Sequence, residues 1–198
     1  MTNDDILKIH QDRFACKKFD PNSSISKEKL DLLLEVARLS PSSVGLEPWK
    51  FIVIEDKDMR QKLKPLCWDQ SQITDASVLI AILSRTKYSL FEKGYIQNRY
   101  KNNPRKEFLI NYIKSLKNVD EWTKKQCYIA LANIMTTAKM LDIDSCAIEG
   151  FNSSQEVTKA LGYDTMEYDL AVMVALGTPA MEKTPKNRLP KDEVVEVI

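Results

Sequence analysis

Two pairs of basic residues have the spacing of side chains that could share one anionic ligand. Arg13 and Lys17 lie four residues apart in "RFACKKF", and Lys186 and Arg188 lie two residues apart in "PKNRLP". Residues four apart share one face of a helix, and residues two apart share one side of an extended segment. Together the four cations would balance the roughly two negative charges of a phosphate monoester. Taken alone, each pair is more typical of an ordinary solvated surface.

A hydroxyl-rich connection is the second feature that could do chemistry. It reads "PSSVG" at 41–45 and is soon followed by an apolar run, "FIVIE", at 51–55. Serine hydroxyls and backbone amides supply the hydrogen bonds that a polar heterocycle edge or a ribityl chain requires. The segment is therefore either a simple turn or a surface that contacts a ligand.

The chain holds few of the residues on which protein-only catalysis depends. His10 is its one histidine, which excludes a His-rich zinc site within one chain. A Ser-His-Asp triad would have to use His10, and no nucleophile motif lies near it. There is also no P-loop and no Gly-x-Gly-x-x-Gly after a strand. If the protein does chemistry, we expect a bound cofactor to carry it.

Bulk properties narrow the class of protein further. The length of 198 residues suits one domain, and a formal net charge of +1 gives no electrostatic case for nucleic acid or an anionic membrane. The apolar runs at 78–83 and 170–176 are too short to span a bilayer, and the acidic N-terminal segment lacks the pattern of a signal peptide. We therefore expect a cytoplasmic protein whose four scattered cysteines are free thiols.

The elements that must position these residues alternate between strand and helix patterns, which predicts one sheet covered by helices. Apolar, β-rich runs predict strands at 51–55, 77–83, 145–151 and 169–177, and the second is apolar on both faces and so central. Cap residues and helical spacing predict helices at 3–12, 27–39, 56–65, 120–141 and 153–161, with exposed helices within 86–118. The apolar stripe of the long helix at 120–141 suits a core, or alternatively a partner surface.

These features resemble the nitroreductase family of FMN-dependent NAD(P)H oxidoreductases. The resemblance runs from about residue 6 to the C-terminus and rests on five motifs in the family's order. They are "RFACKKF" at 13–19, "PSSVGLEPW" at 41–49, "DQSQITDAS" at 69–77, "IEGF" at 148–151 and "PKNRLP" at 185–190. The resemblance implies a single α+β domain over 1–198, with a central, mainly antiparallel sheet covered by helices.

The same resemblance implies an intertwined homodimer with one FMN at each interface. Residues 84–118 would form a helical excursion over the flavin site, and 185–198 an arm onto the partner subunit, whose sheet edge the "VVEVI" ending could join as an exchanged strand. No catalytic side chain is implied, because flavin N5 carries the chemistry. The implied cofactor-binding residues are Arg13, Phe14, Ala15, Lys17, Pro41, Ser42, Ser43, Val44, Gly45, Asp69, Gln72, Glu149, Gly150, Lys186 and Arg188.

Some of these positions carry a more specific expectation from the family. Lys17 would lie nearest the pyrimidine end of the flavin, and the Gly150 amide would donate toward N5. Phe108 and Lys17 would contact substrate, although Phe108 would serve equally well as a packing residue. Four positions depart from the family pattern, which leaves the detailed flavin contacts open: Ala15, Gly45, Glu47 and Asp69.

The implied activity is a ping-pong transfer of two electrons. NADH or NADPH would reduce the flavin, and a planar acceptor, a nitroaromatic or a quinone, would take the electrons from the same face. The alternative is a flavin-binding protein that stores or senses FMN without useful turnover. The sequence contains no visible selector between the two nicotinamide nucleotides.

Overall fold

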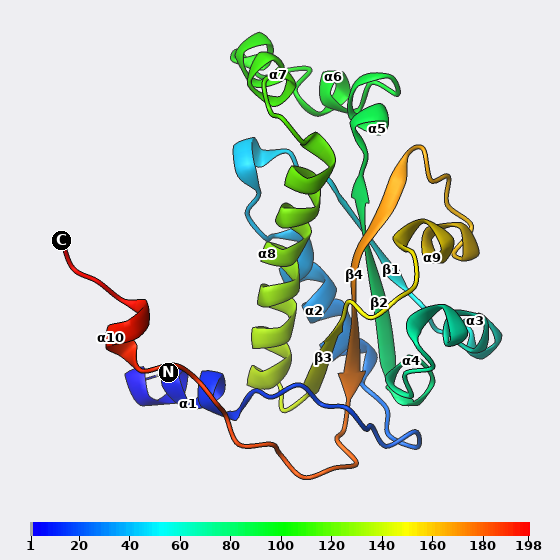
Figure 1. The fold of residues 1–198 in the computed structure, drawn as a ribbon, viewed down its shortest axis with the longest axis vertical. Helices are drawn as coiled ribbons and strands as arrows, with labels where there is room; N and C mark the ends of the chain where they lie inside the picture. Colours follow the sequence, from blue (N-terminus) through cyan, green and yellow to red (C-terminus); the bar gives the residue numbers. More distant parts are fainter. Residues whose placement is uncertain (1) are drawn as a thin grey trace.

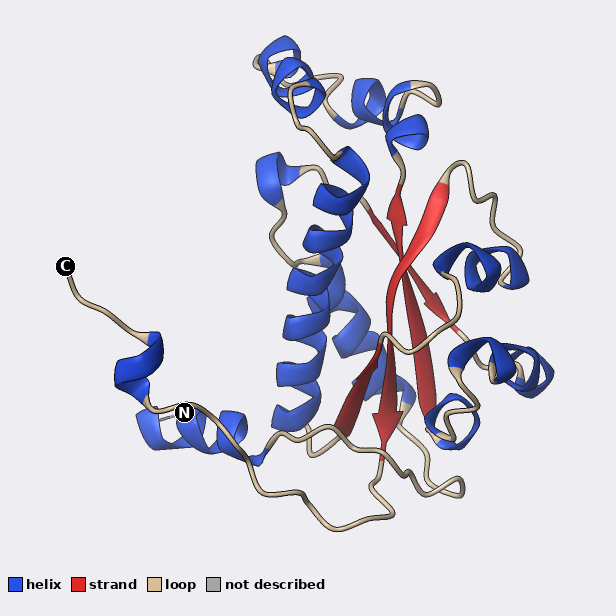
Figure 2. Ribbon diagram, viewed as in Figure 1, coloured by secondary structure: helices blue, strands red, loops and turns tan. Residues whose placement is uncertain are grey.

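A computed structural model describes residues 2–198 as a four-stranded sheet with helices against both faces (Figures 1 and 2). The strands are β1 (Trp49–Val53), β2 (Val78–Arg85), β3 (Asp144–Ile148) and β4 (Tyr168–Gly177), in the order β1-β2-β4-β3. Each neighbouring pair is antiparallel. The predicted α+β class, with a central antiparallel sheet, is therefore confirmed.

The two central strands are apolar on both faces because helices cover both. On one face, Ile80 and Ile82 pack with α8 (Val119–Met140) and α2 (Lys27–Arg38). On the other, Leu79 and Ala81 pack with three shorter helices. These are α3 (Lys57–Leu63), α4 (Gln72–Asp75) and α9 (Ser154–Ala160). Most of the apolar stripe of α8 is buried against the sheet, so the prediction that it packs in a core is confirmed.

Local cap chemistry sets the ends of several helices. Ser26 and Ser153 each accept a hydrogen bond from the third residue beyond them, and Asp56 caps α3 in a similar way. The predicted start of α8 at Asp120 is wrong by one residue. Asn118 is the N-cap and its side chain accepts from the Glu121 amide, which places Asp120 inside the first turn.

The predicted strand at 51–55 is shifted in the structure by two residues. Trp49 and Lys50 pair with the far end of β2, so β1 begins before the apolar run. Glu55 lies outside the strand, because the chain turns into α3 at Asp56. The pairing partner, rather than local hydrophobicity, decides where this edge strand begins.

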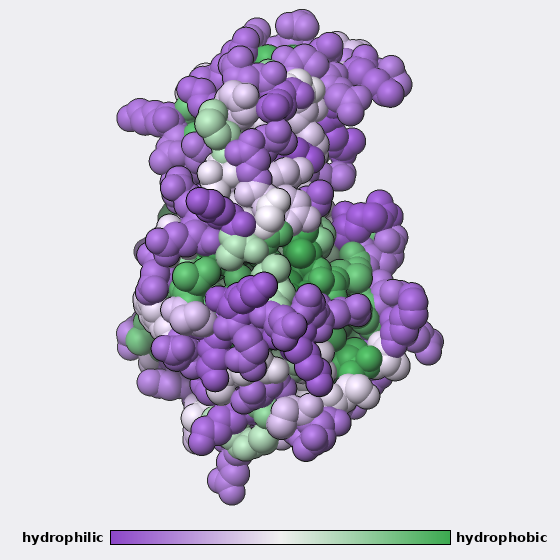
Figure 3. Space-filling view, turned by 90° about the vertical axis from the view of Figure 1, so that its right-hand side faces the viewer, coloured by the Kyte–Doolittle hydropathy of each residue, from purple (hydrophilic) through white to green (hydrophobic). Residues whose placement is uncertain are grey.

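Residues 86–118 contain three short helices, α5 (Lys87–Phe91), α6 (Tyr95–Arg99) and α7 (Lys106–Lys114). They have a small core of their own that includes Leu90, Ile96 and Ile113. This helical excursion stands at one end of the sheet (Figure 1). Figure 3 shows a band of apolar surface across the middle of the face that carries α3 and α9, with more polar surface above and below it.

Both termini project from the side of the molecule that carries α8 (Figure 1). α1 (Asn3–Asp12) ends before Arg13, so Arg13 and Lys17 do not share a helical face. The tail carries α10 (Lys191–Val194), and residues 195–198 form no strand in this single chain. Among residues 2–198, every helix is too short or too polar to cross a membrane.

Candidate functional site

A pocket of about 300 Å³ brings the two basic pairs of the sequence partly together. The N-terminal loop contributes Arg13 and its neighbours, and the tail contributes 184–188. The lining residues are Arg13, Phe14, Ala15, Thr184, Pro185, Lys186, Asn187 and Arg188. Five predicted cofactor-binding residues therefore lie around one pocket, although they come from opposite ends of the chain.

Lys186 ties the tail to the end of α1. Its ammonium donates to the backbone carbonyls of His10 and Arg13, at 2.6 Å each. Partial desolvation and the nearby charges of Arg13, Arg188 and Lys183 lower the pKa of Lys186. Lys183 pairs with Asp12 at 2.6 Å, whereas Arg13 and Arg188 pair with no carboxylate within residues 2–198. The pocket consequently has an excess of positive charge that an anion would relieve.

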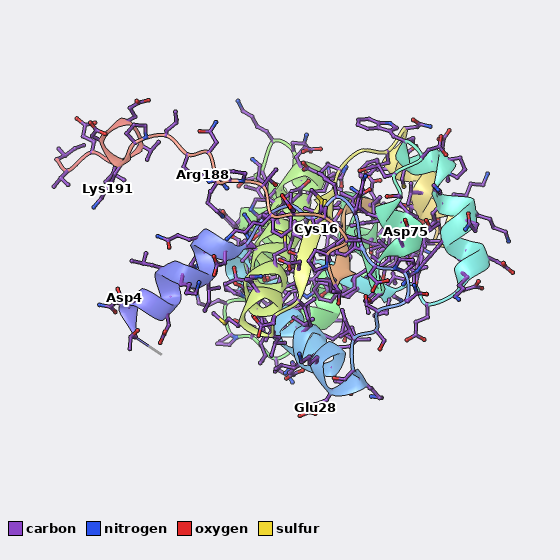
Figure 4. All side chains as sticks on the ribbon, turned by 90° about the horizontal axis from the view of Figure 1, so that it is seen from below. Asp4, Cys16, Glu28, Asp75, Arg188 and Lys191 are labelled. Carbon is purple, nitrogen blue, oxygen red and sulfur yellow. The ribbon has the colours of Figure 1, made fainter. Side chains whose placement is uncertain are left out.

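The outer edge of β3 positions the N-terminal loop beside this pocket. Ala15 forms an isolated bridge with Ser145, and the Cys16 amide donates to the Ser145 carbonyl at 3.1 Å. On its other side the loop meets the tail, where the Lys17 amide contacts the Met181 sulfur at 3.2 Å. Figure 4, from below, shows Cys16 deep in the body and Arg188 on the tail that leads to Lys191.

Lys17 and Gln72 meet at one sulfur atom. Lys17 Nζ lies 3.3 Å from Cys146 Sγ, and Gln72 Nε2 lies 4.0 Å from the same atom. Gln72 and Cys146 are buried, whereas Lys17 is exposed over most of its length. Lys17, predicted near the pyrimidine end of the flavin, and Gln72, predicted to bind the cofactor, are thus close in space despite 54 intervening residues.

Glu149 and Gly150 follow β3 directly and contact two other segments. The Gly150 carbonyl accepts from Gln70 Nε2 at 2.8 Å, and the Trp68 ring packs on the Gly150 Cα. Glu149 accepts a hydrogen bond from the Tyr128 hydroxyl of α8. Burial, together with the Glu149 charge, raises the pKa of Tyr128, so this tyrosine stays protonated at neutral pH.

Trp68 and Asp69 both adopt left-handed backbone conformations, with φ of 55° and 52°. Such conformations are uncommon for residues other than glycine. Trp68 keeps an exposed indole, and Asp69 is exposed beside it. The turn thereby presents a large aromatic surface next to Gly150.

The hydroxyl-rich connection lies elsewhere on the molecule, beside the N-terminal half of α8. The Ser43 amide donates to Gln126 Oε1 at 2.9 Å, and Ser42 Oγ accepts from the Glu47 amide at 2.9 Å. Tyr100 of the excursion donates to the Val44 carbonyl at 3.0 Å. The turn needs left-handed backbone at three positions, Val44, Gly45 and Glu47.

Pro41, Ser42, Ser43, Val44 and Gly45 are therefore not brought to the cation pocket within one chain. Lys139 lies thirteen positions after Gln126 along α8, which corresponds to about 20 Å. Lys139 marks the end of α8 that meets α1 and Asp144. Phe108 also lies apart, exposed on α7, with the Arg105 guanidinium 4.8 Å from its ring centre.

A larger pocket, of about 560 Å³, lies within the excursion. Its lining residues are Lys87, Tyr88, Phe91, Glu92, Gln97 and Lys114. It contains none of the residues predicted to bind a cofactor, and its size alone does not indicate a ligand. The smaller cation-lined pocket has the more specific chemistry.

The sequence alone missed three contact residues in this region: Trp68, Tyr128 and Cys146. Trp68 immediately precedes the "DQSQ" motif, and an exposed aromatic residue beside a motif is a usable signal. Tyr128 and Cys146 have no such signal, because their partners lie at least 21 residues away in the chain.

Comparisons with known proteins identify similar sequences. Residues 11–178 match the model of the Nitroreductase family. A Staphylococcus haemolyticus protein provisionally named an NAD(P)H nitroreductase is 39% identical, over 98% of this chain and 97% of the relative. A Bacillus subtilis protein with a similar provisional name is 35% identical, over 96% of each.

Solved structures share the fold. A provisionally named NAD(P)H:FMN oxidoreductase from Staphylococcus epidermidis matches 100% of this chain and 98% of its own, with a TM-score of 0.83 and 24% identity. A provisionally named nitroreductase from Exiguobacterium sibiricum, solved in complex with FMN, matches 100% of this chain and 99% of its own, with a TM-score of 0.81 and 23% identity.

Proposed function

The chain belongs to the nitroreductase family, and from this premise we propose that it is an FMN-dependent NAD(P)H oxidoreductase. The observation that carries the proposal is the pocket lined by Arg13, Lys186 and Arg188, whose positive charge is not neutralised by carboxylates among the described residues. Guanidinium and ammonium groups are the usual partners of a phosphate monoester. The donor set therefore fits the phosphate end of FMN.

The remaining predicted residues fit the rest of the cofactor. Lys17 and Gln72 would hold the pyrimidine edge, and the Gly150 amide would serve the region of N5. FMN, when bound, would supply the two-electron chemistry by accepting hydride from NADH or NADPH and passing it to an acceptor. Around it, the chain would supply cations, amide donors and an exclusion of water, without a nucleophile or metal of its own.

We further propose that two copies of the chain complete each site. The outer face of α8 keeps exposed apolar side chains, among them Ile129 and Met140. A two-fold axis across this face would place the start of one α8 beside the end of the other. The hydroxyl-rich connection of the partner subunit would then approach this chain's cation pocket, which would account for the separation of the two groups within one chain.

Planar acceptors such as nitroaromatics or quinones are the substrate class that this arrangement favours. Phe108 is 59% exposed and Trp68 is 65% exposed, so both rings are available for stacking on a flat molecule. Phe108 would act as a gate carried by the excursion, and Trp68 as a wall beside Gly150. Lys17 would contact both the cofactor and the acceptor.

A direct experiment separates this enzyme from a protein that only stores or senses FMN. The purified protein should be yellow, and anaerobic NADH or NADPH should bleach its flavin within seconds. Subsequent addition of a nitroaromatic or a quinone should restore the colour. A yellow protein that neither nucleotide bleaches would support the storage function, and a colourless protein that takes up no added FMN would exclude both functions.

A further inference from the structure

Three elements of the candidate site converge at Cys146. Its sulfur lies 3.3 Å from the Lys17 ammonium of the N-terminal loop and 4.0 Å from the Gln72 amide of α4. The thiol itself, on β3, lies 3.3 Å from the Ala147 carbonyl and can donate to it. Cys146 is 1% exposed, so its position is determined by the packed sheet rather than by solvent.

The chemistry of the sulfur distinguishes this contact from an ion pair. A thiol sulfur is a weak acceptor, whereas a carboxylate would neutralise the lysine. Lys17 pairs with no carboxylate within residues 2–198. The contact with Cys146 therefore fixes the location of the ammonium while leaving its positive charge available to a ligand.

The position of Cys146 on β3 matters because other residues of the candidate site lie on or beside the same strand. Ser145, which precedes Cys146, bridges to Ala15 of the cation pocket. Glu149 and Gly150 follow the same strand only a few residues later. Cys146 thus lies between the groups proposed to hold the phosphate and the group proposed to lie near N5.

We propose that Cys146 is a positioning residue that holds Lys17 and Gln72 in place for the flavin without neutralising Lys17. The inference rests on the proposed FMN function and deepens it. Reduction adds negative charge to the flavin, and a fixed cation stabilises that charge better than a mobile one. Cys146 acts through Lys17, so removing the sulfur should weaken binding of the reduced flavin more than binding of the oxidised flavin.

The test compares Cys146→Ala and Cys146→Ser by redox titration of the bound flavin against a reference dye. Cys146→Ala should bind reduced flavin about three- to tenfold less well relative to oxidised flavin, which lowers the two-electron potential by about 15–30 mV. Cys146→Ser keeps an acceptor and should recover most of the difference. Cys127→Ala, which removes a buried thiol from the opposite side of the sheet, should leave the potential unchanged.

A double-mutant cycle with Lys17→Met tests whether Cys146 acts through the lysine. In the Lys17→Met background, Cys146→Ala should shift the potential no further. If Cys146→Ala fails to fold, Cys146→Val fills similar space on the strand without an acceptor and should give the same shift.

Two results would overturn the proposal while leaving the FMN function intact. One is an unchanged potential in a folded, FMN-binding Cys146→Ala or Cys146→Val protein. The other is an equal shift with and without Lys17. A wild-type protein that binds no FMN would instead overturn the proposed function together with this role of Cys146.

Discussion

Lys186 and Arg188 lie two residues apart, but their side chains have different hydrogen-bond partners in the folded chain. The Lys186 ammonium is engaged by two backbone carbonyls at the end of α1. The Arg188 guanidinium has one backbone contact, to the carbonyl of its neighbour Asn187 at 2.6 Å. We infer that Lys186 mainly anchors the tail and that Arg188 carries more of the phosphate recognition.

Arg188→Ala should therefore weaken FMN binding about ten- to a hundredfold, because a charge-assisted contact of roughly 1.5–3 kcal/mol is lost. Riboflavin, which has no phosphate, should bind almost as well as before. Fluorescence titration of the apoprotein with FMN and with riboflavin measures the two affinities. Lys191→Ala, a nearby tail cation outside the pocket, is the matched control, and an equal loss for both flavins would show that Arg188 does not meet the phosphate.

Gln72 offers a second test at this scale, because it is a neutral residue beside the Lys17 ammonium. Gln72→Lys should raise the two-electron potential of the bound flavin by about 20–40 mV, which corresponds to roughly 1–2 kcal/mol. Lys17→Ala should lower the potential and slow reduction by NAD(P)H.

Dye-coupled redox titration measures the potential in each variant, and stopped-flow absorbance measures the rate of reduction. Unchanged potentials in both variants would mean that this pair does not lie near the flavin.

Among the elements, the β3–α9 connection and the turn at 68–70 depend on each other through one glycine. A methyl group at Gly150 would lie 2.6 Å from Trp68 Cε3 and 2.8 Å from Gln70 Nε2. Both distances are far below normal contact, so glycine is required for the two segments to approach as they do.

Gly150→Ala should consequently destabilise the fold by about 1–3 kcal/mol, the usual cost of overpacking, and weaken FMN binding. The double variant Gly150→Ala/Trp68→Ala should recover most of the stability, because the ring that clashes is gone. Urea denaturation of both variants, and of Trp68→Ala alone, measures how far the destabilisation by Gly150→Ala depends on the Trp68 ring. Full stability of Gly150→Ala would mean that the exposed ring simply moves aside.

Helices whose first residues are set by nearby cap residues were predictable from the sequence, whereas contacts between distant segments were not. The ends of α2 and α9 follow from Ser26 and Ser153, whose hydrogen bonds reach three residues along the chain. Lys17 and Gln72 meet at Cys146 because the N-terminal loop pairs with the edge of β3 and α4 packs on the sheet face, and no local sequence pattern indicates either contact. For the same reason the family motifs pointed to Lys17 and Gln72 as candidate cofactor-binding residues but not to the sulfur that lies between them.

At the scale of the whole molecule, the proposed dimer would form through the exposed face of α8. Ile129 and Met140 are 38% and 43% exposed on a helix whose opposite side is core. Apolar residues repeated along one side of a helix are typical of an interface. A substitution that disrupts this interface should therefore both separate the subunits and release FMN.

Ile129→Glu should dissociate the dimer and release FMN, because two carboxylates would be buried near the two-fold axis without partners. Gln61→Glu, at an exposed position of α3 on the other side of the sheet, is the matched control and should retain both properties. Sedimentation velocity with absorbance at the protein and flavin wavelengths reports assembly and FMN content in one run. A monomeric Ile129→Glu protein with full FMN content would contradict the shared site.

Deletion of 189–198 tests the contribution of the tail. These residues include α10 and a highly exposed apolar end, with Val197 at 93% exposure. Their loss should weaken the dimer and lower FMN affinity in parallel, since the arm would lose its contact with the partner subunit. Equilibrium sedimentation with and without FMN measures the linkage, and a truncated protein with unchanged dimer affinity would argue against the exchanged arm.

The strand order β1-β2-β4-β3 also has a consequence for synthesis on the ribosome. β2 and β4 form the centre of the sheet, but their first residues are 90 positions apart in the chain. Until residue 177 has emerged, β2 lacks the pairing partner for one edge of its eight mostly buried residues. A nascent chain in this state exposes an aggregation-prone strand for several seconds at ordinary translation rates. The chain should therefore depend on holdase chaperones late in its synthesis, and far less once β4 is in place.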